Sequence, residues 1–144
     1  MAMPSAEQLN AVLRGFDRLY GLEFLEVSDT DTRARVQLRD ELRQPMGPLH
    51  GGVIASLAES MTSLVTAFAV ADRGATALGL SNDTSFLRPI TEGAVQAHAT
   101  RLHGGRTTWV WDVRFRGDAG RLCAITRMTI AVRPLPEGQE PLPS

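Results

Sequence analysis

The feature that most constrains the fold is a stretch of 28 residues, positions 44–71, in which only Glu59 carries a formal charge. Large apolar residues recur in it at steps of three and four, the period of one helix face. We therefore expect one long helix over residues 52–71. The stretch is as long as a membrane span, but His50, Glu59 and several hydroxyl side chains make it too polar for a lipid-facing helix. A buried helix of a soluble domain fits better.

The remaining chain predicts a short helix followed by strands. Ser5 and Gln8 form a capping-box pattern, so we expect a helix over residues 6–20 that ends at Gly21. Segments with strand-like alternation follow, separated by turn residues. They cover residues 22–28, 33–38, 75–87, 94–102, 107–116 and 121–132.

Strands at hairpin-like spacing around one long helix predict an α+β fold. Because that helix has a broad apolar surface, the sheet must wrap it. The chain of 144 residues, 43% of them hydrophobic, is long enough to bury one core without disulfides or metals. We expect a helical segment over residues 1–20, the main domain over 21–132 and a flexible, proline-rich tail over 133–144.

Composition excludes several classes of function. The net charge is −1, so no global basic field would attract nucleic acid, although all 15 basic residues are arginine. The single cysteine, Cys123, allows no internal disulfide and favours a reducing, cytoplasmic location. No Cys/His cluster has zinc-ligand spacing, and residues 1–10 lack a signal-peptide pattern. We therefore expect no metal site and no membrane partner.

Glu59 is the first candidate for chemistry. Burying an unpaired carboxylate is costly, so it must be hydrogen-bonded, protonated or directed into a cleft. A solvated helix face normally carries several charges, and this helix has only one, which favours the cleft. Ser63, one turn further on, can hydrogen-bond to Glu59 or to a shared water. The face expected to be small or polar consists of Gly52, Ser56, Glu59, Ser63 and Thr66.

The start of the helix supplies a second candidate. The segment His50-Gly51-Gly52 stands where free backbone N–H groups and the positive end of the helix dipole gather, and these can polarise a carbonyl. Gln44 adds a neutral amide in the preceding loop. With Glu59 as base or nucleophile, this set can transfer an acyl group to water. No GxSxG or phosphate-binding glycine motif occurs, and Cys123 reads as core, so a serine or cysteine triad is unsupported.

These segments resemble a known family. QPMGPLHGG at residues 44–52, followed by LAESMTS at 57–63, is similar to the hotdog-fold acyl-CoA thioesterases. The likeness extends over about residues 21–131. It is greatest to the glutamate-dependent branch acting on 4-hydroxybenzoyl-CoA, 1,4-dihydroxy-2-naphthoyl-CoA and phenylacetate-pathway thioesters. The resemblance implies a long helix wrapped by a curved antiparallel sheet of five to six strands. It also implies homodimers that pair edge to edge, usually stack into homotetramers and hold the active sites between subunits.

The resemblance also implies roles for individual residues. Glu59 would attack the thioester carbonyl or activate water to do so, and the family pattern leaves both open. The Gly51 N–H would hold the thioester oxygen. Gln44 and His50 would position the thioester or the leaving thiolate, and Ser63 would orient Glu59 or the water. The substrate would be an aromatic or medium-chain acyl-CoA. No separate cofactor is implied, since coenzyme A is part of the substrate.

The family tends to contact the CoA nucleotide at two further places. One corresponds to Arg88, and the other to the segment from His103 to Thr108. Small residues there would admit the chain, and an arginine with two hydroxyl groups can hold phosphate. Read from the sequence alone, Arg88 and Arg106 are equally compatible with an ordinary surface position. The second segment comprises His103, Gly104, Gly105, Arg106, Thr107 and Thr108.

Two other functions remain open at this stage. One is a hotdog hydratase or dehydratase, which would need a catalytic histidine paired with a helix carboxylate. His50 is too close to the helix start for the usual spacing, which weakens that interpretation. The other is a non-catalytic module or sensor that binds acyl-CoA without turnover.

Overall fold

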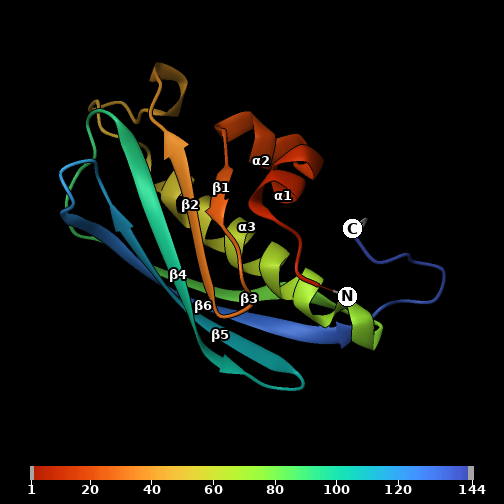
Figure 1. The fold of residues 1–144 in the computed structure, drawn as a ribbon. Coiled ribbons are helices and arrows are strands. Elements are labelled where there is room, and N and C mark those ends of the chain that lie inside the picture. Colours follow the sequence, from red (N-terminus) through yellow and green to blue (C-terminus); the bar gives the residue numbers. More distant parts are fainter. Residues whose placement is uncertain (1, 143–144) are drawn as a thin grey trace.

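The structure, a computed structural model, describes residues 2–142. The chain forms two short helices and two strands, then the long helix, then four long strands (Figure 1). The helices are α1 (Ala6–Val12), α2 (Gly15–Tyr20) and α3 (Gly51–Val70), with 3₁₀ turns η1 (Asp40–Leu42) and η2 (Ala71–Arg73). The strands are β1 (Glu23–Glu26), β2 (Asp31–Gln37), β3 (Ala75–Phe86), β4 (Ala94–Gly104), β5 (Thr108–Arg116) and β6 (Leu122–Pro134).

The six strands form one antiparallel sheet in the order β1-β2-β4-β5-β6-β3. The sheet curves around α3, and α1 and α2 lie on the same side of it as α3 (Figure 1). The expected α+β arrangement, a long helix wrapped by a curved antiparallel sheet, is therefore confirmed. The strand positions agree with the sequence prediction to within three residues at each end.

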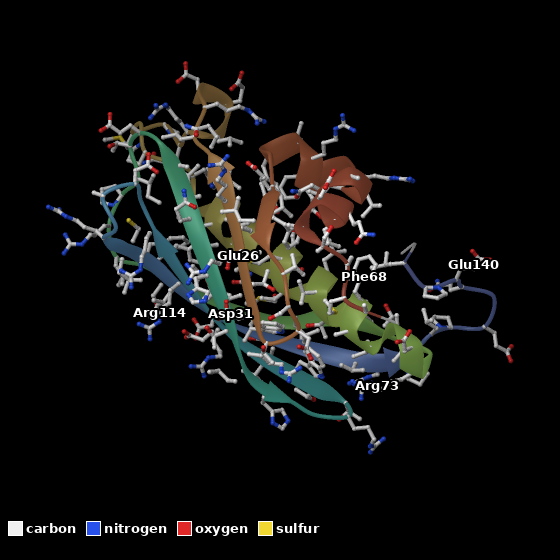
Figure 2. The ribbon with its side chains drawn as sticks, in the orientation of Figure 1. Glu26, Asp31, Phe68, Arg73, Arg114 and Glu140 are labelled. Carbon is white, nitrogen blue, oxygen red and sulfur yellow. The ribbon has the colours of Figure 1, made fainter. Side chains whose placement is uncertain are left out.

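The core lies between α3 and the concave face of the sheet. Alternate residues of β5, namely Trp109, Trp111, Val113 and Phe115, are buried there. Their neighbours face outward, and Arg114 points away from the helices (Figure 2). The helix is long and apolar enough to cross a membrane, but 61% of its most apolar window is buried inside this chain. A core helix has that property.

The N-terminal segment differs from the expectation of one helix over residues 6–20. The capping box of Ser5 and Gln8 is present, and Gly21 ends α2 with a φ of 84°. Between the two helices, however, Leu13 is extended and buried, and Gly15 has a φ of 57°. A positive φ is readily available only to glycine, so the chain turns there and forms two helices.

Two other expectations need correction. The sequence predicts Thr66 on the polar face, but it is buried, and its hydroxyl accepts a hydrogen bond from the Trp111 indole at 3.0 Å. The expected tail over residues 133–144 begins too early, because β6 continues through Pro134. Residues 143–144 of that tail, and Met1 of the N-terminal segment, lie outside the described residues.

Strand β3 is an edge of the sheet and frames the site described below. Among the described residues it pairs with β6 on one side only. Large apolar side chains on and next to it are more than half exposed, although such residues are normally buried. They are Leu78, Leu80, Phe86 and Leu87.

Candidate active site

Glu59 projects from α3 into an open cleft. Its side chain is exposed, and no described residue forms an ion pair or hydrogen bond with its carboxylate. The backbone of β3 passes close by, because a Cβ added to Gly79 would lie 3.4 Å from Glu59 Oε1. Such a Cβ would be in ordinary van der Waals contact with the carboxylate, so Glu59 lies directly beside the edge strand.

The cleft around Glu59 has a volume of about 480 Å³ and lies between α2 and β3. Its floor is the part of α3 that carries Glu59, and three residues of the sequence-predicted face, Ser56, Glu59 and Ser63, line the cavity. The helix contributes Ser56, Glu59, Ser60, Ser63, Leu64 and Ala67, whereas Phe16 and Asp17 come from α2, Thr76 and Ala77 from β3, and Leu142 from the tail.

Ser63 lies in this cleft but does not bond to Glu59. Its hydroxyl oxygen is buried and has no hydrogen-bond partner among the described residues. A buried hydroxyl without a partner is costly. Ser63 therefore has donor and acceptor capacity available for a group that enters the cleft, such as a water or a substrate atom.

The start of α3 leaves one N–H group free. His50 is the N-cap, and its Nδ1 accepts a hydrogen bond from the Gly52 N–H at 2.8 Å. The Gly51 N–H has no acceptor among the described residues. A Cβ on Gly51 would come within 2.9 Å of the Phe86 ring, so this position is closely covered by the end of β3.

Gln44 and Gly51 share a second pocket, of about 360 Å³, with the residues that follow β3. The Gln44 Oε1 accepts a hydrogen bond from the Met46 N–H at 2.6 Å, which fixes the side-chain amide while its NH₂ group stays free of described partners. His50 lines neither this pocket nor the Glu59 cleft. It lines a groove with Phe16 and Val53, so it is next to Gly51 in the chain but in a different pocket from Gln44 and Glu59.

Glu59 and Gly51 do not meet within one chain. Eight residues separate them on α3, and a rise of 1.5 Å per residue places them about 12 Å apart along the helix axis. Glu59 faces the Thr76 end of β3, whereas Gly51 and Gln44 face its Phe86 end. One thioester carbonyl cannot contact both groups of the same copy.

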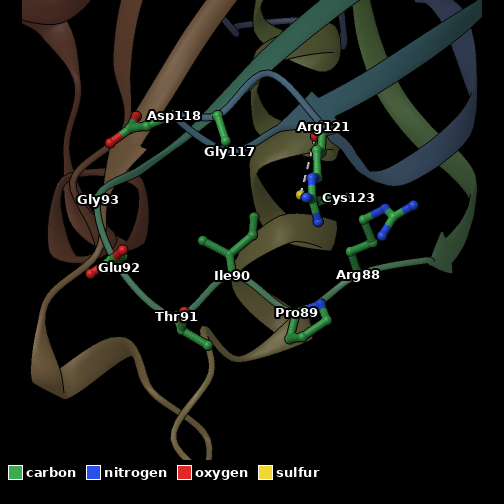
Figure 3. Close-up of a pocket in the computed structure, with 11 residues that line it drawn as sticks. Arg88, Pro89, Ile90, Thr91, Glu92, Gly93, Gly117, Asp118, Arg121 and Cys123 are labelled. Atoms are coloured by element: carbon green, nitrogen blue, oxygen red, sulfur yellow. Dashed lines mark hydrogen bonds between the residues drawn. The ribbon is translucent and has the colours of Figure 1, made fainter.

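The candidate CoA contacts are also divided. Arg88 lines a pocket of about 560 Å³ with Arg121, and the two guanidinium groups lie on the same side of it (Figure 3). Neither has an ion-pair partner among the described residues. The Arg88 N–H bonds to the carbonyl of Cys123 at the beginning of β6. Cys123 itself is buried and free.

The segment from His103 to Thr108 forms the tip of the β4–β5 hairpin, at the other end of β6. Its Thr107 carbonyl accepts a hydrogen bond from the Val132 N–H. The indole of Trp109 donates to the Gly105 carbonyl at 3.0 Å, and Arg101 stacks over that ring at 4.4 Å. Nine residues of strand separate Cys123 from Val132, or about 30 Å. Arg88 and the hairpin tip are thus distant within one chain.

A family model described as the thioesterase superfamily matches residues 46–124, the part of the chain that contains α3 and both ends of β3. The chain belongs to the thioesterase superfamily. A crystal structure of a mutant thioesterase from Pseudomonas aeruginosa is 38% identical, with a TM-score of 0.87 over 92% of this chain and 96% of that chain. A thioesterase structure from Haemophilus influenzae is 31% identical, with a TM-score of 0.87 over 95% and 96%. The 1,4-dihydroxy-2-naphthoyl-CoA hydrolase of Listeria monocytogenes is 30% identical, covering 83% of this chain and 96% of its own length.

These findings confirm the hotdog fold and the resemblance inferred from the sequence. This thioesterase is an enzyme that hydrolyses thioesters.

Sequence reasoning missed the part that α2 plays in this thioesterase. Asp17 accepts a hydrogen bond from the Ser60 hydroxyl at 2.5 Å, and the Tyr20 phenol donates to the same oxygen at 3.2 Å. Burial raises the pKa of Tyr20 above its ordinary value, and the negative charge of Asp17 raises it further. The only available sequence signal was the short helix pattern, which does not indicate which element it packs against.

Proposed function

We propose that this thioesterase hydrolyses acyl-CoA thioesters, with aromatic or medium-chain acyl groups, to a free acid and CoA in the cytoplasm. The observation that carries the proposal is the unpaired Glu59 carboxylate, which stands in an open cleft directly beside an edge strand. The similarity to the 1,4-dihydroxy-2-naphthoyl-CoA hydrolase of Listeria monocytogenes supports the choice of substrate class.

The reaction requires an oxygen atom to add to the thioester carbonyl and the C–S bond to break. Glu59 either forms an anhydride that water then cleaves, or removes a proton from the attacking water. In both routes the thiolate of CoA leaves and takes up a proton. The carbonyl oxygen, which becomes negative, needs a preorganised donor. The free Gly51 N–H at the helix terminus is suited to that role, and the Gln44 NH₂ group is suited to holding the thioester.

We further propose that two copies complete each active site. The open edge of β3 offers unpaired backbone groups and exposed apolar side chains, which favour pairing with another strand. If two copies pair antiparallel about a two-fold axis near Ser81 and Asn82, the Thr76 end of each β3 lies opposite the Phe86 end of the other. Glu59 of one copy then approaches Gly51 and Gln44 of the other.

The same axis would bring together the two CoA-binding regions. Arg88 follows the Phe86 end of β3, and the β4–β5 hairpin tip lies near the strand's beginning, because β6 joins the two. Arg88 of one copy would then lie near Arg106 of the other. Guanidinium groups suit the phosphates of CoA, so this nucleotide site supports an acyl-CoA substrate over a simple ester. No separate cofactor is part of the proposal.

Substitution of Glu59 by Gln tests this function. The purified enzyme and the variant are offered a panel of aromatic and aliphatic acyl-CoAs, with a reagent that traps the released thiol. We expect kcat for the preferred substrate to fall by about 10²- to 10⁴-fold in Glu59→Gln, because an amide can neither attack nor accept a proton. Glu7→Gln, on α1 and outside the cleft, is the matched control and keeps wild-type kcat.

The panel also separates the alternatives. Binding without thiol release in every member would contradict the proposal and favour a binding module. Conversion of an enoyl-CoA to its hydroxy form would favour a hydratase. Undiminished thiol release by Glu59→Gln would leave hydrolysis in place and remove Glu59 from it.

A further inference from the structure

The Glu59 cleft contains a second carboxylate that the proposed reaction does not use. Asp17, half-buried on α2, directs Oδ1 to the Ser60 hydroxyl and the Tyr20 phenol. Its other oxygen, Oδ2, takes no hydrogen bond from any described residue, and no described cation pairs with it. One oxygen is therefore fixed by the fold, while the other retains its acceptor capacity.

Asp17 and Glu59 belong to different walls of the same cavity. Glu59 stands beside Gly79 on the β3 side, and Asp17 is on the α2 side, anchored to Ser60, which follows Glu59 on α3. If the carbonyl carbon of an acyl group meets Glu59, the rest of that group can extend into the space in front of α2, which lines the same cavity. The Phe16 side chain adds an aromatic surface there.

An ionised carboxylate can only accept hydrogen bonds. A purely hydrocarbon acyl group would cover the free Asp17 oxygen and remove it from water without replacing the lost hydrogen bonds, which is costly. An acyl group bearing a hydroxyl or another N–H or O–H donor would satisfy it. A site built to bind a donor discriminates against the analogue that lacks it.

We propose that Asp17 is a specificity-determining residue of this thioesterase, which selects acyl groups that carry a hydrogen-bond donor on the part remote from the thioester. The proposal rests on the proposed function, because it takes the Glu59 cleft as the acyl site. It assigns to α2 the selection of the acyl group and to α3 the chemistry.

Asp17→Asn provides the test. The asparagine oxygen can keep the bonds to Ser60 and Tyr20, while the free carboxylate oxygen is replaced by an NH₂ donor. The measurement is kcat/KM for benzoyl-CoA and its three monohydroxy isomers. We expect wild-type enzyme to prefer at least one hydroxy isomer over benzoyl-CoA by about tenfold or more, and the preference to disappear in Asp17→Asn. Asp40→Asn, whose side chain is 95% exposed on η1, is the matched control and keeps the preference.

A merely structural Asp17 would give a different result. Loosening of α2 would lower kcat/KM for benzoyl-CoA and its hydroxy isomers alike and leave their ratio unchanged, which would overturn the proposal. Thermal unfolding of each variant shows whether the fold is retained. Affinities for the corresponding thioether analogues, which cannot be hydrolysed, report the same preference without turnover. A wild-type enzyme that binds the hydroxy and unsubstituted analogues equally would also overturn it. Absence of thiol release by the wild-type enzyme, with the binding preference intact, would instead contradict the proposed hydrolysis and leave the selective role of Asp17 in place.

Discussion

Tyr20 couples the N-terminal segment to the helix that carries Glu59. It is the only tyrosine in the chain, and its side chain is 1% exposed. The phenol donates to Asp17 and lies 3.5 Å from the Ser56 carbonyl of α3. Burial and the neighbouring negative charge both disfavour the phenolate, so the raised pKa keeps the hydroxyl protonated and able to donate.

Because the pKa of Tyr20 is raised in the folded state, the free energy of unfolding depends on pH in the alkaline range. The contribution of Tyr20 is fully present below the unfolded value of 10.0 and is lost as the pH rises above it, because the unfolded state then releases its proton first. Tyrosinate absorbance reports Tyr20 alone. In the folded enzyme we expect the Tyr20 phenol to ionise only above pH 10, in the same pH range in which the circular dichroism signal of the fold is lost. In the urea-unfolded chain we expect it to ionise near pH 10. Reversible ionisation of Tyr20 near pH 10, with the fold intact, would contradict the burial of its phenol.

At the residue scale the sequence made Glu59 a candidate for the site but gave no indication of Asp17. Glu59 could be recognised because it is the single charge in a long apolar stretch. Asp17 stands among other polar residues in a short helix, and its bond to Ser60 joins positions 43 residues apart. Local patterns carry no information on such a contact. The side-chain orientation of Ser63, which depends on packing, was likewise not predictable.

Helix α3 is buried on more sides than its apolar period indicated. The sheet wraps it so far that Thr62 and Thr66 are both buried. Thr62 bonds only to its own helix, through the Ala58 carbonyl at 2.7 Å. Thr66 donates to the Thr62 carbonyl in the same way, but also accepts from Trp111 on the sheet. Both threonines therefore bond to α3, but only the Thr66 hydroxyl also bonds to the sheet.

Thr66→Val tests this difference. The substitution keeps the shape but leaves the buried Trp111 indole N–H without an acceptor, so the free energy of unfolding should fall by about 1–3 kcal/mol. Chemical denaturation measures it. Thr62→Val is the matched control and should change the free energy by less, because the Ala58 carbonyl lies within the helix and the valine remains in an apolar site. Equal effects at both positions would contradict a structural role for the Trp111 bond.

Element positions followed from the sequence wherever periodicity was strong. The long helix and the later strands were predicted because their apolar residues recur regularly and turn residues separate them. The break between α1 and α2 was not, because Leu13 leaves the helical conformation in order to pack in the core. Tertiary burial outweighed the local helix preference there.

At the scale of the whole molecule, one chain carries two incomplete halves of the proposed site. Glu59 and the hairpin tip lie toward the Thr76 end of β3, and Gln44, Gly51 and Arg88 lie toward the Phe86 end. Sequence motifs identified the candidate residues, but their separation along β3 became visible only in the structure. The proposed pairing of two open β3 edges would bring the two halves together without moving any element.

Mixing two inactive variants tests the central claim most directly. Glu59→Gln and Gln44→Ala are unfolded and refolded together, so that their copies associate at random. In a mixed dimer one site receives Glu59 from the Gln44→Ala copy and Gln44 from the Glu59→Gln copy, and is intact. The other site carries both substitutions and is inactive. Half the dimers are mixed and each has one good site, so thiol release should recover to about a quarter of the wild-type rate. A mixture that stays as inactive as each variant refolded alone, although mixed dimers form, would contradict a site shared between two copies.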